Sequence, residues 1–139
     1  MENTQLLKAS FEQLATFLAG SPEENHTLEF KRKTSPNDLD LHKEDRRLLG
    51  EALSGFANAT GGVLILGVAT EKHQNIDRAK AIHPIGNVVT AANRVRAYIN
   101  ECVSPVVDGV KVRSIAQSDG TGLILISVPR GQARPHMST

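Results

Sequence analysis

The chain has 139 residues and a mass of 15.0 kDa, a length that gives one domain with its own hydrophobic core. Its residues are 40% hydrophobic and 22% charged, which is typical of a folded protein and excludes wholesale disorder and fibrous repeats. No apolar run approaches the roughly 20 residues of a membrane span, and no signal peptide is visible, so we expect no membrane association. The one cysteine, Cys102, cannot form an intrachain disulfide and indicates a reducing, cytoplasmic compartment.

The net charge of +1 does not by itself indicate a charged partner. The distribution of acidic and basic residues along the chain does indicate one. Residues 1–29 carry five glutamates and a single lysine, whereas the excess of basic groups lies in residues 30–139. A split of this kind is typical of a chain whose main body binds a polyanion, although it also arises by chance in a small domain.

The chain begins with a predicted amphipathic helix over residues 4–19. Apolar residues recur there at helical spacing: Leu7, Phe11, Leu14 and Leu18. Gly20 is placed to end the helix, so we treat residues 1–20 as an N-terminal helix and residues 21–139 as the main domain. The apolar stripe must be covered by the domain or by a second copy of the chain. We favour the second copy, alone or together with the domain, and therefore expect a homodimer.

The main domain alternates strands and helices. Alternating or continuous apolar runs predict strands at residues 27–33, 63–68, 110–114 and 122–128. Helical periodicity predicts helices over residues 40–58 and 87–103, whereas residues 70–86 show no period and are predicted to be a mobile loop. Asp119-Gly120 predicts a hairpin turn between the last two strands. The expected fold is an α/β (α+β) sandwich, with one mixed sheet of about four strands packed on two helices and an extra N-terminal helix.

Three segments carry a resemblance to a known family. They are Thr27-Leu-Glu-Phe-Lys31, Leu53-Ser-Gly-Phe-Ala-Asn58 and Gly61-Gly-Val-Leu-Ile-Leu-Gly-Val68. In this order they resemble the Schlafen-type AlbA_2 domain, and Ile124-Leu-Ile-Ser-Val-Pro129 followed by Arg134-Pro-His136 resembles the last segment of that domain. The resemblance covers about residues 21–136 and implies a fold similar to Alba, a chromatin protein that binds nucleic acid as a dimer.

The resemblance also implies function. Bacterial members are described as transcriptional regulators, so we expect a DNA- or RNA-binding domain of such a regulator or of a defence-type protein. Members of the family are additionally described as ATP-binding. Related domains of animal Schlafen proteins include metal-dependent RNases, whose active site uses two glutamates and an aspartate. We therefore expect a nucleic-acid-binding domain, with a metal-dependent endoribonuclease and a protein-interaction module as alternatives.

The nuclease pattern is only partly present. Glu24 and Glu29 match its two glutamates, and Lys31 shares a strand face with Glu29, so the three would hold Mg²⁺ or Mn²⁺ and a phosphate together. The third acidic position is occupied by Ala69, and the nearest acid is Glu71. The alternative is that Glu29 and Lys31 form an ordinary surface pair. The sequence thus leans toward a domain that binds without cleaving and that needs no cofactor.

Six basic residues are predicted to contact phosphates: Lys31, Lys33, Arg46, Arg47, Lys111 and Arg113. They would form one stripe if the first strand, the start of the helix at residue 40 and the third strand share a face. No aromatic residue is interleaved with them, so we expect contact with the backbone of DNA or RNA without base readout. Ordinary solvated charge is the alternative.

Asn58, Gly61 and Gly62 join a helix directly to a buried strand, where glycine supplies positive φ without steric cost. No G-x-x-x-x-G-K-[S/T] pattern is present, and these glycines precede a strand rather than a helix. We therefore favour a structural role for them over ATP binding.

Overall fold

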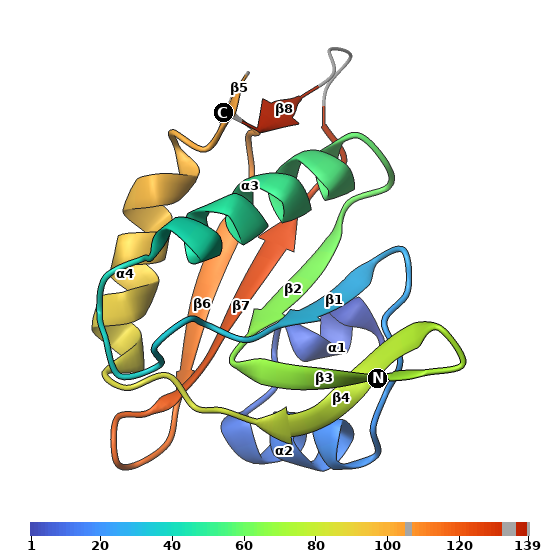
Figure 1. The fold of residues 1–139 in the computed structure, drawn as a ribbon, viewed down its shortest axis with the longest axis vertical. Helices are drawn as coiled ribbons and strands as arrows, with labels where there is room; N and C mark the ends of the chain where they lie inside the picture. The colour runs from blue at the N-terminus through green and yellow to red at the C-terminus, as the bar shows by residue number, and fades with distance from the viewer. Residues whose placement is uncertain (105–106, 132–135, 139) are drawn as a thin grey trace.

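The computed structural model describes residues 1–104, 107–131 and 136–138. At its centre lies a four-stranded sheet with helices on both faces (Figure 1). In spatial order the strands are β1 (Leu28–Lys31), β2 (Gly62–Leu66), β7 (Gly122–Val128) and β6 (Lys111–Ala116). β1 runs parallel to β2, and the other two pairings are antiparallel. The predicted α/β class and mixed sheet are confirmed.

β2 shows why a continuous apolar run forms a strand here. Val63 and Ile65 point to one face of the sheet, whereas Leu64 and Leu66 point to the other. All four are buried, because helices or a hairpin cover each face. β7 is built in the same way and completes the centre of the sheet.

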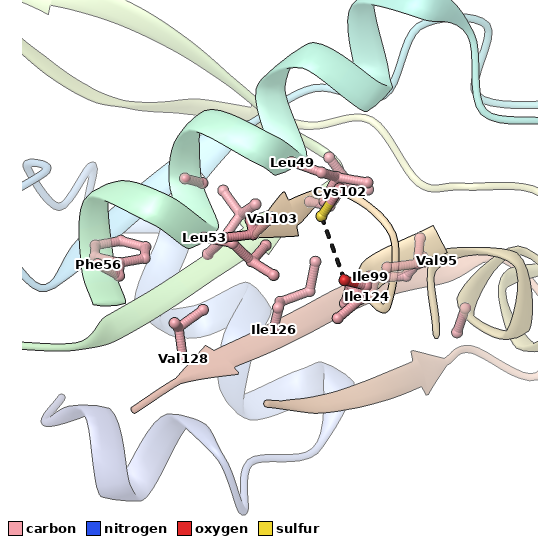
Figure 2. Packing of buried hydrophobic residues seen from close by; sticks show 14 of the residues in the cluster. Leu49, Leu53, Phe56, Val95, Ile99, Cys102, Val103, Ile124, Ile126 and Val128 are labelled. Atoms are coloured by element: carbon pink, nitrogen blue, oxygen red, sulfur yellow. Dashed lines mark hydrogen bonds between the residues drawn. The ribbon is translucent and has the colours of Figure 1, made fainter. Parts of the chain in front are cut away.

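One face is covered by α3 (Lys43–Ala57) and α4 (Val88–Ile99). Figure 2 shows Leu49, Leu53 and Phe56 of α3 packed over Ile126 and Val128 of β7. The predicted helix over residues 87–103 is too long, since α4 ends at Ile99. The chain then forms a short strand, β5 (Val103–Ser104), which pairs with β8 (Met137–Ser138).

Cys102 lies buried just before β5, with its Sγ 3.5 Å from the carbonyl oxygen of Ile99 (Figure 2). Burial raises the pKa of its thiol, so the thiolate needed for nucleophilic chemistry is disfavoured. Cys102 therefore packs as a small apolar residue.

The opposite face is covered by two short helices, α1 (Asn3–Leu6) and α2 (Phe11–Ala19), where one continuous helix was predicted. The break occurs because Ser10 starts a new helix. Its hydroxyl accepts from the amide of Gln13, and the Gln13 side chain accepts from the amide of Ser10.

The apolar stripe of the N-terminal segment packs on the sheet of its own chain. Leu14 and Leu18 are buried there, and Leu7 and Phe11 pack against the same cluster. The stripe therefore no longer supports the predicted homodimer, because the chain itself covers it. The homodimer stays a prediction. The boundary placed after residue 20 also stays a prediction.

Residues 70–86 are not the predicted loop. They contribute to a hairpin of β3 (Val68–His73) and β4 (Ile76–Ile82), joined by Gln74 and Asn75 in left-handed conformations. The period escaped detection because the hairpin buries few of its residues, among them Val68 and Ala79. Gly67, with φ of 113°, separates β2 from β3 and sends the hairpin away from the main sheet.

Candidate functional site

The motif around Asn58 is explained by folding alone. The Asn58 side chain donates to the carbonyl of His136 and accepts from its amide, both at 2.7 Å, and so ties the end of α3 to the C-terminal segment. Gly61 has φ of 81°, and a Cβ there would lie 2.6 Å from the Val128 carbonyl oxygen. A Cβ at Gly62 would overlap the Phe56 ring. Of the three residues, only Gly61 has the predicted positive φ, whereas Asn58 is held by its hydrogen bonds and Gly62 by the lack of space beside Phe56. Arg134 and Pro135 of the tail motif lie outside the described residues.

The six predicted phosphate contacts do not form one stripe. Lys31 lies on β1 and points to the face that α3 covers, as its partner Leu66 does. Lys111 and Arg113 lie on β6, at the other edge of the sheet, and point to the opposite face with Leu125. The sheet itself separates the two groups.

Lys33 is a structural residue rather than a surface cation. Its side chain has no exposed area, and its ammonium donates to four backbone carbonyls at 2.7–3.4 Å: Thr34, Ser35, Asp38 and Asp40. The carboxylate of Asp45, equally buried, lies 3.8 Å away and accepts from the amides of Thr34 and His42. The prediction that Lys33 contacts phosphate does not fit this burial, because the ammonium already holds residues 34–42 in place.

Arg46 and Arg47 lie at the start of α3, and both are exposed. Arg47 pairs with Glu44 and, at 2.7 Å, with Glu51 on its own helix. These carboxylates offset its charge, which leaves Arg46 as the more available of the two for an anion.

Glu24, Glu29 and Lys31 do come together. They line a cavity of about 270 Å³ between β1 and α3, with Glu51 and Phe56 on the helix side. The Glu24 carboxylate accepts from the amide of Phe30 at 2.8 Å, and Lys31 Nζ lies 3.8 Å from Glu29 Oε1. The three side chains that the resemblance names thus lie together, and their catalytic or metal-binding role stays a prediction.

The protonation of the two glutamates follows from their surroundings. Burial raises the pKa of Glu24 and of Glu29, and neighbouring carboxylates add to the effect in both cases. Lys31 opposes it. The pair is thus costly to ionise fully, and a bound cation would relieve that cost.

A third acid, Glu51, also lines this cavity, but its carboxylate pairs with Arg47 at 2.7 Å. The position that the nuclease pattern gives to its third acid does not line the cavity. Ala69 lies on β3 opposite Ala81, and the Glu71 carboxylate is engaged by Arg78 at 3.1 Å. Across residues 1–104, 107–131 and 136–138, no three His, Cys, Asp or Glu side chains are grouped to hold a metal ion. With Glu51 paired to Arg47, the carboxylates of Glu24 and Glu29 supply fewer hard oxygen ligands than a divalent cation prefers.

β6 forms one edge of the sheet and lies beside α4 (Figure 1). A larger groove of about 970 Å³ is lined by residues of both elements. Its lining includes four cationic side chains and one acid: Lys8, Arg96, Lys111, Arg113 and Asp108. They come from the segment after α1, from α4, from β6 and from the turn before β6. The groove thus extends around the edge strand β6 from one face of the sheet to the other.

Two of these cations are held in place. Arg113 donates to the carbonyl of Leu7 at 2.9 Å, and Arg96 donates to the carbonyl of Val112 at 2.8 Å. Lys8 and Lys111 are exposed, and within the described residues neither has an ion-pair partner. The basic groove, as we call it, therefore combines two guanidinium groups held by backbone carbonyls with two exposed ammonium groups.

Of the four cations that line this groove, the sequence analysis named Lys111 and Arg113 as candidates but not Lys8 and Arg96. Lys8 lies about 100 residues from Lys111 in the chain, and only the docking of α1 on the sheet brings them to one groove. Arg96 carried a usable signal, since it lies in the last turn of α4 on the side away from the core.

Comparison with known proteins gives a family and a fold. The family model described as Schlafen, AlbA_2 matches residues 24–139. A solution structure from Nitrosomonas europaea, the N-terminal domain of a candidate ATP-dependent DNA helicase RecG-related protein, superposes with a TM-score of 0.62 at 16% identity. The match covers 94% of this chain and 81% of that domain.

A second structure, the DIP2311 protein of Corynebacterium diphtheriae, gives a TM-score of 0.48 at 19% identity and covers 90% of this chain and 22% of that one. No curated protein matches the sequence. None of the helices in the described part of the chain is long and apolar enough to cross a bilayer.

Proposed function

The chain belongs to the Schlafen AlbA_2 family, and from this premise we propose that it binds nucleic acid through the phosphate backbone at the basic groove. The observation that carries the proposal is the gathering of four cations around one hollow, with a single carboxylate among them. Phosphates are the anions that such a surface binds with little sequence preference.

The other predicted contacts support the proposal less well. Lys31 is paired with Glu29, and Arg47 is paired with two glutamates, so an incoming phosphate would have to displace a carboxylate at each. Lys33 is buried. At Lys8 and Lys111 of the basic groove, a phosphate can bind without displacing a carboxylate.

The family resemblance extends the proposal to a domain of a bacterial transcriptional regulator or a defence-type protein. The Nitrosomonas europaea domain belongs to a RecG-related protein named for DNA helicase activity, which agrees with a nucleic-acid partner. Whether that partner is DNA or RNA is decided by the binding experiment that follows.

The test measures the affinity for labelled duplex DNA and for RNA as salt is raised. Each cation that neutralises a phosphate adds about 0.9 to the slope of log K against log salt on duplex DNA, so four cations weaken binding about 150-fold between about 50 and 200 mM salt. Lys8→Gln combined with Lys111→Gln should reduce that loss to about 12-fold. Both lysines are exposed, so the double variant keeps the fold.

Lys80→Gln is the matched control, because Lys80 is an exposed lysine on β4 that does not line the basic groove. It removes one charge and should change the slope by less than either groove lysine does. If Lys80→Gln lowered the slope as much as Lys8→Gln, the binding would be diffuse and the assignment to the basic groove wrong. Absence of binding at about 50 mM salt would reject the function itself.

The second candidate function is metal-dependent RNA cleavage at the cavity of Glu24, Glu29 and Lys31. Its support is the convergence of these three side chains and the raised pKa values of the two glutamates. The residues present would supply two carboxylates to Mg²⁺ or Mn²⁺ and an ammonium to a phosphate. Cleavage that needs added Mn²⁺, stops with EDTA and is lost in Glu29→Gln would establish it. RNA that stays intact with the wild-type protein and added Mn²⁺ would exclude this function.

A further inference from the structure

The basic groove has an apolar floor, which phosphate binding alone does not use. Six aliphatic side chains from the two faces of the sheet line it, and we call them together the floor: Leu7, Ile99, Val107, Val110, Val112 and Leu125. We propose that the basic groove receives an unpaired strand, with a base lying on this floor while the cations hold the flanking phosphates. This inference rests on the proposed function and names the class of nucleic acid that it binds.

The shape of the site favours a single strand over a duplex. Its volume of about 970 Å³ lies at the upper end of the range for pockets that enclose a small molecule. A duplex presents phosphates outward and keeps its bases stacked inside, so it would bridge the hollow and leave the aliphatic floor uncovered. An unpaired nucleotide can turn its base away from its phosphate and place that base in the basic groove.

The arrangement of charge agrees with such a strand. Lys111 and Arg113 reach the hollow from β6, Lys8 from the segment after α1, and Arg96 from α4. Cations thus come from both sides of the floor, where the phosphates before and after an inserted base would lie.

Two polar side chains in the lining are suited to a base rather than to a phosphate. The Asp108 carboxylate repels phosphate, but it accepts hydrogen bonds from the exocyclic amine of a base. The Asn100 amide, exposed at the end of α4, both donates and accepts. No aromatic side chain of the described residues lines the basic groove, so the base contacts are aliphatic and the sequence preference is modest.

We expect the single strand to bind more tightly than the duplex. Electrostatic attraction alone predicts the reverse order, so the measured order distinguishes the two modes of binding. Duplex DNA carries a higher charge density than a single strand, so contact through phosphate alone favours the duplex. A base on the floor should reverse this order and make the single strand the tighter ligand.

The experiment compares a labelled single strand of about 12 nucleotides with its duplex at roughly 0.1 M salt, in DNA and in RNA. Val110→Thr keeps the shape of the floor and adds a hydroxyl, and Asn100→Ala removes the amide at an exposed position. Each should weaken the single strand several-fold and leave the duplex unchanged, whereas Lys80→Gln should leave the ratio unchanged. Amide chemical shifts recorded during the titration should move at residues 107–113.

Each outcome decides something. A single-strand preference lowered by Val110→Thr or Asn100→Ala, with shifts at residues 107–113, supports the inference. Equal or tighter duplex binding overturns it and leaves the proposed function standing, whereas no binding to any strand overturns both. Adenosine 5′-monophosphate that competes as well as the strand would identify a mononucleotide pocket and overturn the inference, as would shifts confined to other elements. If inorganic phosphate competed with the labelled strand as well as an unlabelled strand does, the base would have no role and the inference would be overturned too.

Discussion

Lys33→Met tests whether the buried ammonium is part of the fold or part of a binding surface. The substitution preserves most of the length of the side chain and removes five electrostatic partners at once, namely four carbonyls and the Asp45 carboxylate. Neither charged side chain of the pair has exposed area, so the Asp45 charge that remains would be buried and uncompensated. Removing one partner of such a pair costs about 3–5 kcal/mol.

That cost is large for a domain of this size, whose free energy of unfolding is on the order of 5–15 kcal/mol. Lys31→Met provides the matched control, since Lys31 lies two residues earlier, is partly exposed and pairs with Glu29 at 3.8 Å. A pair of that kind contributes about 0–1 kcal/mol. The same substitution at neighbouring positions should therefore differ by at least about 2 kcal/mol in its effect.

Urea denaturation followed by circular dichroism at pH 7 measures both variants on one scale. The assignment of Lys33 to the fold would be refuted if Lys33→Met cost less than about 1 kcal/mol. A folded Lys33→Met protein with a lower salt slope for nucleic acid would instead restore the phosphate contact that the sequence predicted.

Three further predictions concern single residues. Asn58→Ala removes both hydrogen bonds to His136 and should cost about 1–3 kcal/mol, with faster hydrogen exchange of the amides at residues 136–138. Gly61→Ala forces a Cβ toward the Val128 carbonyl at positive φ and should cost about 1–3 kcal/mol in thermal unfolding. Because the folded state raises the pKa of Glu29 above 4.5, wild-type stability falls as pH rises through that pKa, and Glu29→Gln should lose this part of the fall when urea midpoints are compared from pH 4 to pH 7.

The secondary structure was largely predictable because its apolar patterns are local. Strands β1, β2, β6 and β7 and helix α3 follow runs or periods that can be read within one segment. The β3–β4 hairpin was missed for the same reason, since its polar residues on a partly covered surface leave no period to detect. Its turn at Gln74 and Asn75 also lacks the glycine that marks most two-residue hairpins.

The site was less predictable because it depends on strand order and on one local bend. Alternation along the first strand places Glu29, Lys31 and Lys33 on one face. The chain leaves β1 after Lys31 and reaches φ of 51° at Ser35, and Lys33 becomes enclosed by the carbonyls that follow it. Likewise, no local signal shows that β1 and β6 occupy opposite edges of the sheet.

The residues that carry the resemblance to the family are not those proposed to bind. Phe56, Asn58 and Gly62 are occupied by packing and by hydrogen bonds to the chain itself. Lys8 and Lys111 lie outside the motif segments and are exposed, so they can change without affecting the fold. It follows that a domain with the same motif but neutral residues at these two positions should fold alike and bind nucleic acid weakly at this edge. Exchanging only those residues between two such domains should transfer the salt-dependent binding and leave thermal stability unchanged.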